Sequence, residues 1–201
     1  EETIVDRCFE VAKSTEKLGI LNSFDYYQLV IDHLCNFGKS EFVSIVDIAK
    51  PIESGKIAIA LRHDVDADIV TAIRCANYLK SKSVAGTFFI LHTSHYYGNF
   101  QIEEENLTFT RHEGFKTLLS QLRETDAEIG IHNDALGVIF EHGSDGFSAF
   151  ETELAWLRSQ DIKVTGTAAH NSPFVYGAEC FEIFEGLAVA DRKYIVWRGK
   201  M

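Results

Sequence analysis

Two aspartates lie two positions apart in this 201-residue sequence, at Asp64 and Asp66. On an extended backbone this spacing directs both carboxylates to one side of the chain and directs His63 and Val65 to the other. Two carboxylates held close repel each other, and a divalent cation or a shared proton relieves the repulsion. The pair therefore predicts a metal site or an acid–base site. The alternative is that one of them caps a following helix, a role that Asp68 is also placed to take.

Two histidines further along the chain complete a candidate metal site. His132 follows the apolar stretch 128–131, and His170 follows the small residues of 165–169, which leave space in front of an imidazole. A histidine such as His132, taken alone, is more often a packed or hydrogen-bonded structural residue, and His170 alone is also weak evidence. One carboxylate and two imidazoles together form a three-ligand set with an open position, the usual arrangement of a catalytic zinc or iron ion. We therefore expect a divalent metal ion here, with zinc as the first expectation and iron or cobalt as alternatives.

The apolar pattern predicts the elements that must position these residues. Buried parallel strands are predicted at four short apolar runs, 57–61, 87–91, 128–131 and 162–168. Helices are predicted between them at three amphipathic stretches, 69–79, 112–124 and 147–159. Two further apolar runs, 187–190 and 194–197, could add strands. The alternation predicts βα units and a mainly parallel sheet, open or closed as a barrel.

The histidines are distributed as such a fold requires of an active site, because ligands bind at the carboxyl ends of parallel strands. Five of the eight histidines follow predicted strands: His63, His92, His95, His132 and His170. The other three, His33, His112 and His142, fall in predicted helices or loops. We therefore expect the chemistry to gather at one edge of the sheet.

The N-terminal part has a different pattern. Apolar residues at helical spacing predict a helix over 24–36, with Ser23 as its N-cap and Gly38 at its end. Residues 1–55 are expected to form a mainly helical layer that precedes the βα units of 56–201. No linker composition separates the two parts, so we expect one domain over 1–201.

The composition argues against several classes of function. The formal net charge is -11, so the electrostatic field would repel nucleic acid and anionic membrane surfaces. The four cysteines form no Cys-x-x-Cys pair, which argues against a thiolate zinc site and against a disulfide framework. No apolar run approaches membrane-spanning length, and residues 1–6 lack the features of a secretory leader. We expect a cytoplasmic protein with reduced thiols and no membrane insertion.

The order of the motifs adds a family resemblance. Residues 60–92, which begin Ala-Leu-Arg-His-Asp-Val-Asp and end Gly-Thr-Phe-Phe-Ile-Leu-His, resemble the polysaccharide deacetylase (NodB-homology, carbohydrate esterase) superfamily, as does Glu-Ile-Gly-Ile-His at 128–132. The resemblance is closest to the branch with an Arg-His-Asp-Val-Asp motif that is associated with surface-polysaccharide biosynthesis, and it covers about residues 56–175. It implies a distorted (β/α)7 barrel, of which the predicted strands supply five or six, so the barrel is expected to be incomplete.

The resemblance also implies roles for individual residues. Asp64 takes the place of the family's general base, and Asp66 and His132 take the places of metal ligands. With His170 as the third ligand, these residues form the expected metal site. Four neighbouring residues are expected to contact the substrate: Arg62, His63, His92 and Asn171.

The sequence departs from the family's pattern at three places. A typical member has a second metal-binding histidine one helical turn after the first, where this sequence has Leu136. His170 is the expected replacement, with His142 and Asp134 as alternatives. The family's Arg-x-Pro-Tyr motif is replaced by the sequence at 170–173, and its late leucine–histidine motif, which provides the general acid, is not found. Either the domain extends past the given sequence or part of the catalytic apparatus is lost.

The resemblance implies a metal-dependent hydrolase that removes acetyl groups from N-acetylated sugars of a surface polysaccharide or its precursor. Two alternatives stay open. A catalytically degenerate relative would bind carbohydrate or act as a scaffold. A metal-dependent phosphoesterase would use the same ligands, but a phosphate site usually has a glycine-rich cradle or clustered basic residues. Only Arg62 and Arg74 lie near the motifs.

Overall fold

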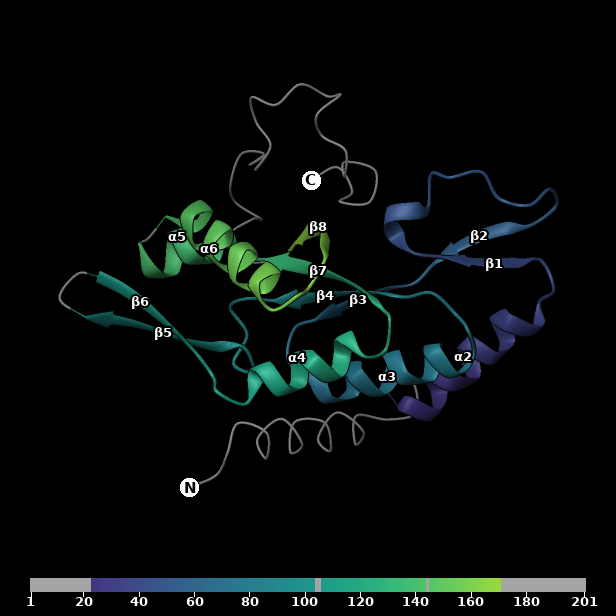
Figure 1. Ribbon diagram of the computed structural model, residues 1–201, viewed down its shortest axis with the longest axis horizontal. Coiled ribbons are helices and arrows are strands. Elements are labelled where there is room, and N and C mark those ends of the chain that lie inside the picture. The colour runs from purple at the N-terminus through teal and green to yellow at the C-terminus, as the bar shows by residue number, and fades with distance from the viewer. Residues whose placement is uncertain (1–22, 104–105, 144, 171–201) are drawn as a thin grey trace.

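The computed structural model describes residues 23–103, 106–143 and 145–170 (Figure 1). The predicted strands at 187–190 and 194–197 lie outside these residues, as does Asn171. The centre of the fold is a parallel sheet with the strand order β3-β4-β7-β8. Its strands are β3 (Arg62–Val65), β4 (Thr87–Leu91), β7 (Glu128–Asn133) and β8 (Val164–Ala169). The mixed α/β class with a parallel sheet is therefore confirmed.

The register of this sheet brings the predicted site residues to one edge. Leu91, the last residue of β4, lies opposite His132, and His132 lies opposite Ala168 of β8. Asp66 directly follows β3, and His170 directly follows β8. Because the strands are parallel, these residues all lie at the carboxyl edge, as the sequence predicts.

In the described residues, five α-helices pack around the sheet. They are α2 (Phe24–Asn36), α3 (Ile69–Ser81), α4 (Phe115–Arg123), α5 (Ala135–His142) and α6 (Gly146–Ser159). Figure 1 shows α2, α3 and α4 side by side below the sheet, whereas α6 packs beside β8 and against α5. In α3 the buried residues Ile69, Ile73, Ala76 and Leu79 recur at helical spacing and face the core. They join the apolar side chains of the central strands in one main hydrophobic cluster.

The starts of two helices confirm the capping predictions. The Ser23 side chain accepts a hydrogen bond from the Tyr26 backbone N–H at 3.1 Å, and the Asp68 carboxylate accepts one from the Thr71 N–H at 2.9 Å. Each cap satisfies a backbone donor that has no partner within its helix. Asp68 therefore caps α3, which leaves Asp64 and Asp66 available for another role.

The strand predicted at 57–61 differs from the structure. Residues Ile57–Ala60 form β2, which pairs in parallel with β1 (Ser40–Val43) in a separate two-stranded sheet. Ile57 is 52% exposed, so β2 is not the doubly buried strand that its apolar run suggests. The chain changes sheets at Leu61, and Arg62–Val65, predicted as the loop after the strand, is the edge strand β3. In the described part of the N-terminal layer, residues 23–55, the chain forms β1 and the short 3-10 helix Ile45–Asp47 in addition to a helix over Phe24–Asn36.

An antiparallel hairpin was also not predicted. It consists of β5 (Gly98–Glu103) and β6 (Asn106–Arg111) and extends away from the central sheet (Figure 1). Apolar and polar residues alternate in the sequence of both segments, which is the pattern of a half-buried strand. The hairpin places its last residue, Arg111, over the ring of Trp156 in α6 at 4.3 Å.

Three further predictions concern the chain as a whole. The parallel strands described here form an open sheet of four and a pair, so closure into a (β/α)7-type barrel stays a prediction.

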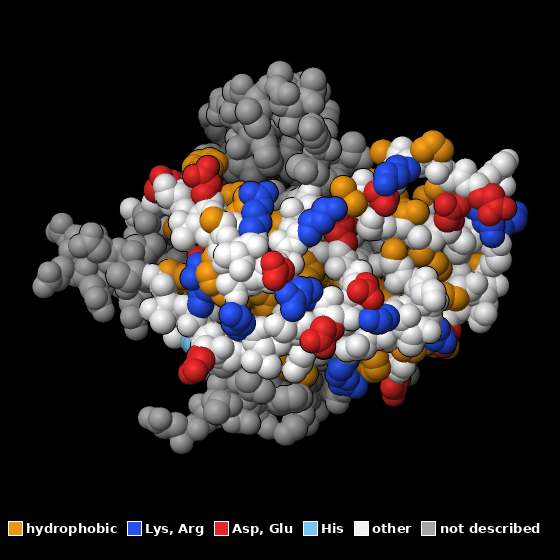
Figure 2. Space-filling view, viewed as in Figure 1, with side chains coloured by type: hydrophobic (Ala, Val, Ile, Leu, Met, Phe, Trp, Pro, Cys, Tyr) orange, Lys and Arg blue, Asp and Glu red, His pale blue; other side chains and the backbone are white. Residues whose placement is uncertain are grey.

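In the part of the chain that the structure describes, no helix is both long and apolar enough to cross a membrane. Cys35 and Cys75 are free thiols. On the face seen in Figure 2, basic and acidic side chains are interspersed.

Candidate metal centre

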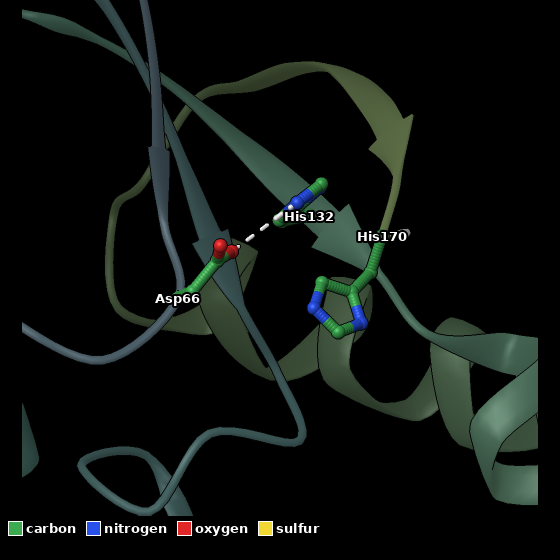
Figure 3. A group of neighbouring side chains, drawn as sticks. All are labelled: Asp66, His132 and His170. Carbon is green, nitrogen blue, oxygen red and sulfur yellow. Dashed lines mark ion pairs between the residues drawn. The ribbon is translucent and has the colours of Figure 1, made fainter. Parts of the chain in front are cut away.

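Asp66, His132 and His170 converge at the carboxyl edge of the central sheet. One potential ligand atom from each residue lies within 4.8 Å of those of the other two. Figure 3 shows the three side chains pointing toward a common space, from the ends of three different strands. The three residues named as metal ligands from the sequence are thus the ones that the fold brings together.

His132 is the buried member of the group, with 3% of its side chain exposed. Its Nδ1 lies 3.0 Å from the carbonyl oxygen of Ala168. A carbonyl oxygen can only accept, so Nδ1 carries the proton and Nε2 presents its lone pair. Burial is the main cause that lowers the pKa of His132 below its ordinary value, so the ring is neutral at neutral pH. This is the tautomer in which a histidine binds metal through Nε2.

The lone pair of His132 faces two carboxylates. Nε2 lies 3.4 Å from the Oδ1 atom of Asp66 and 3.8 Å from the Oδ2 atom of Asp64. A neutral imidazole nitrogen and a carboxylate oxygen are both acceptors, so neither satisfies the other. A cation between them would satisfy all of these atoms. The donor set therefore fits a divalent metal ion, and two imidazoles with one carboxylate fit zinc.

Asp64 points to the same side as Asp66, as the spacing predicts. Arg62 holds its carboxylate through two hydrogen bonds, from Nε to Oδ1 at 2.8 Å and from Nη2 to Oδ2 at 2.9 Å. The Arg62 guanidinium also lies over the Phe89 ring, 5.4 Å from its centroid. The Arg62 side chain is 39% exposed and that of Asp64 is 35% exposed. Both are therefore within reach of a molecule bound at this edge.

Asp66 lies in the loop after β3, and a second loop fixes its backbone. The Ser94 hydroxyl donates to the Asp66 carbonyl oxygen at 2.7 Å. The Tyr96 hydroxyl donates to the carbonyl oxygen of Val65 at 2.6 Å and accepts from the Leu91 N–H at 2.9 Å. The loop after β4 thus holds the backbone of the loop after β3. The Asp66 side chain stays 56% exposed, so the metal site has an open side.

His170 is oriented by a carboxylate that the sequence suggested only as an alternative ligand. Its Nδ1 lies 3.5 Å from the Oδ2 atom of Asp134. Its ring stands perpendicular to that of His132, with the centroids 5.2 Å apart. The contact with Asp134 raises the pKa of His170 above the ordinary histidine value. His142, the other alternative ligand, lies at the opposite end of α5 from Asp134.

Two residues expected to contact the substrate are packed against other parts of the fold. His63 points to the other side of β3, where Nε2 lies 2.9 Å from the Tyr27 hydroxyl and the ring stacks on Phe88 at 4.1 Å. His92 is fully buried, and its Nε2 accepts a hydrogen bond from the Asp134 N–H at 2.8 Å. These positions indicate structural roles for both histidines. Arg62 alone among the described substrate candidates lies beside the site.

A cavity of about 460 Å³ lies at the opposite, amino-terminal edge of the sheet, lined by Glu128 and Thr165 among others. The Glu128 carboxylate is engaged there, with Oε2 accepting from the Ile45 N–H at 2.9 Å and from the Thr87 hydroxyl, and Oε1 accepting from the Thr165 hydroxyl at 2.6 Å. A carboxylate whose acceptors are used in this way holds the fold together. The candidate chemistry therefore stays at the carboxyl edge.

No protein-family model matches this chain, and neither does any curated protein or solved structure. The resemblance to polysaccharide deacetylases therefore rests on the sequence motifs alone and stays a prediction. The geometry at Asp66, His132 and His170 is independent of that resemblance.

Proposed function

We propose that this protein is a metal-dependent hydrolase that removes acetyl groups from N-acetylated sugars of a surface polysaccharide or its precursor. The main support for a metal site is the position of His132 Nε2. This unprotonated nitrogen lies beside the carboxylates of Asp66 and Asp64, so acceptors face one another with no proton between them. The acetamide substrate is proposed from the motif resemblance. A cytoplasmic location is part of the same proposal.

The proposed ligands are Asp66, His132 and His170, and zinc is the proposed ion. When bound, such an ion polarises the amide carbonyl and lowers the pKa of water beside it. Its ligands leave an open side for substrate, because Asp66 is more than half exposed.

Asp64 is proposed as the general base. Its Oδ2 lies on the same side as Asp66 and 3.8 Å from His132 Nε2, so a water molecule held in that space is within reach of the carboxylate. Asp64 takes the proton of this water as its oxygen attacks the acetyl carbonyl carbon. The C–N bond then breaks, the amine nitrogen takes up the proton that Asp64 accepted from the water, and acetate leaves. Arg62 fixes the orientation of the Asp64 carboxylate throughout.

The first experiment is metal analysis of the purified protein and of an Asp66→Ala, His132→Ala double variant. We expect about one zinc or similar ion per chain in the wild type and none in the variant, since two of three ligands are lost. A matched control is the Asp25→Ala, His33→Ala double variant, because both residues are exposed on α2. The control should retain the ion. A wild type that binds no divalent ion after loading would contradict the proposal.

The substrate is tested by acetate release from N-acetylated sugars by the metal-loaded protein. Asp64→Asn should bind metal as the wild type does and lose activity, because an amide cannot accept the proton of water. Undiminished deacetylation by this variant would refute the assignment of Asp64 as the base.

A second candidate is a carbohydrate-binding protein without catalysis. The observation that favours it is Leu136, which stands where the family has a metal-binding histidine. Sugar binding with no metal and no acetate release would support this candidate over the hydrolase.

A further inference from the structure

Asp134 lies behind the metal centre and has no role in the function proposed above. Four contacts fix its position. Its Oδ1 accepts from the Gly137 N–H at 3.1 Å, which caps α5, and its Oδ2 accepts from the Thr93 hydroxyl at 3.0 Å. Its backbone N–H donates to His92, and its Oδ2 also faces His170 Nδ1 at 3.5 Å. With only 13% of its side chain exposed, Asp134 is held in one orientation.

The Asp134 carboxylate favours a proton on the His170 nitrogen that faces it, through an ion-pair contact at 3.5 Å that lies outside hydrogen-bond geometry. An ionised carboxylate only accepts hydrogen bonds, so the Nδ1 that faces Asp134 is the protonated nitrogen. In the neutral ring Nε2 then has the lone pair. Figure 3 shows one ring nitrogen of His170 on the side of Asp66 and the other turned away. Since Nδ1 contacts Asp134, the nitrogen toward Asp66 is Nε2.

We infer that Asp134 is a positioning residue that holds His170 with Nδ1 protonated and so makes its Nε2 available as a metal ligand. A ligand histidine whose second nitrogen is held by a carboxylate is a recurring arrangement at metal sites. The ligand role of His170 rests on the proposed function. The proton position on the His170 ring does not, because it follows from the contact with Asp134 alone.

His92 supports Asp134 from the interior. It is fully buried, and Nε2 accepts the Asp134 N–H, so its own proton is on Nδ1, which has no hydrogen-bond partner among the residues that the structure describes. A buried donor without a partner is destabilising. Burial lowers the pKa of His92 to about 4, so the ring stays neutral and Nε2 remains an acceptor. An apolar residue at position 92 would avoid the unpaired donor but would leave the Asp134 N–H without its acceptor.

The test is Asp134→Asn. An asparagine keeps the cap of α5 when its oxygen faces Gly137, and its amide N–H group then faces His170. That group donates, so Nδ1 must accept and the proton moves to Nε2. In the metal-free protein, above the pH at which the ring titrates, ¹⁵N NMR of the His170 side chain should show this exchange of protonated nitrogens. Competition with a chromogenic chelator should show a loss of zinc affinity of about 10- to 100-fold.

Two other variants separate this role from a structural one. Asp145→Asn makes the same change at the N-cap of α6, where the carboxylate accepts from the Phe147 and Ser148 N–H groups, and should change neither readout. Asp134→Ser keeps a capping oxygen but is too short to hold His170, so it provides a second variant if the asparagine does not fold. It should also lower zinc affinity.

The results distinguish the inference from the proposed function. An unchanged His170 proton position in Asp134→Asn, in a protein that binds zinc, would overturn the inference and leave the hydrolase proposal standing. The exchange of nitrogens in a protein that never binds a divalent ion would support the inference and overturn the hydrolase proposal.

Discussion

Gly130 links the packing of the sheet to the metal centre, and its replacement by alanine is a sharp test of the geometry. A Cβ atom at position 130 would lie 2.5 Å from two ring carbons of Phe89 and 2.9 Å from the carbonyl oxygen of Gly166 in β8. Phe89 is 1% exposed and cannot swing into solvent. The β7–β8 pairing is already irregular between Ile129 and Ile131. The strain should therefore push β8 away from β7.

The expected cost is about 1–3 kcal/mol of unfolding free energy, as for other overpacked core positions. In a chain of this length each kcal/mol lowers Tm by about 2–4 °C, so Tm should fall by roughly 2–12 °C in the metal-free protein. The displaced β8 also carries the Ala168 carbonyl that holds His132 Nδ1 at 3.0 Å. Loss of that hydrogen bond should weaken zinc binding by about tenfold or more.

Thermal unfolding and chelator competition measure the two effects separately. Gly38→Ala is the matched control, because Gly38 has φ of +72° and nothing within 4 Å of an added Cβ. It should lose about 1–2 kcal/mol from the left-handed backbone alone and keep its zinc affinity. A Gly130→Ala variant with wild-type Tm and wild-type affinity would refute the packing argument.

Two further predictions concern charge. The contact with Asp134 raises the pKa of His170, so a metal ion must displace the Nε2 proton of the protonated ring while Nδ1 keeps the proton that faces Asp134. Zinc affinity measured by competition should therefore rise with pH through that pKa and then level off. In the metal-free protein the protonated ring stabilises the fold below the unfolded-state pKa, and thermal unfolding should show this contribution lost as pH rises through the folded-state pKa. Separately, Arg111→Met leaves the Glu153 carboxylate, 5% exposed, with the Tyr97 hydroxyl as its one remaining donor in the described part of the chain. Urea unfolding should show a loss of about 3 kcal/mol, the low end for a broken buried pair because Arg111 is 23% exposed; an unchanged midpoint would contradict this account.

The sequence predicted the candidate metal site better than it predicted the sheet. Alternation along an extended chain suffices to place Asp64 and Asp66 on one side, and parallel strands suffice to bring His132 and His170 to the same edge. The position of the sheet change at Leu61 was not predictable, because an apolar run indicates that a segment is buried but not which strand pairs with it.

The two buried histidines illustrate a different limit. His63 and His92 follow apolar runs just as His132 does, and their residue type alone does not distinguish a ligand from a packed side chain. What decides is a partner far away in the sequence: Tyr27, 36 residues before His63, and the backbone of Asp134, 42 residues after His92. Only the folded chain specifies such contacts.

Strand β7 is fixed at both of its ends, and this has a consequence for how accurately the site can form during folding. A slip of one residue would turn His132 away from Asp66 and, at the other end, would take Glu128 away from its two hydroxyl and two backbone amide donors. The penalty for misalignment therefore arises at the amino end, before any metal is present. The chain can select the correct strand alignment without help from an ion, so the metal-free protein should already hold His132 in place to bind one.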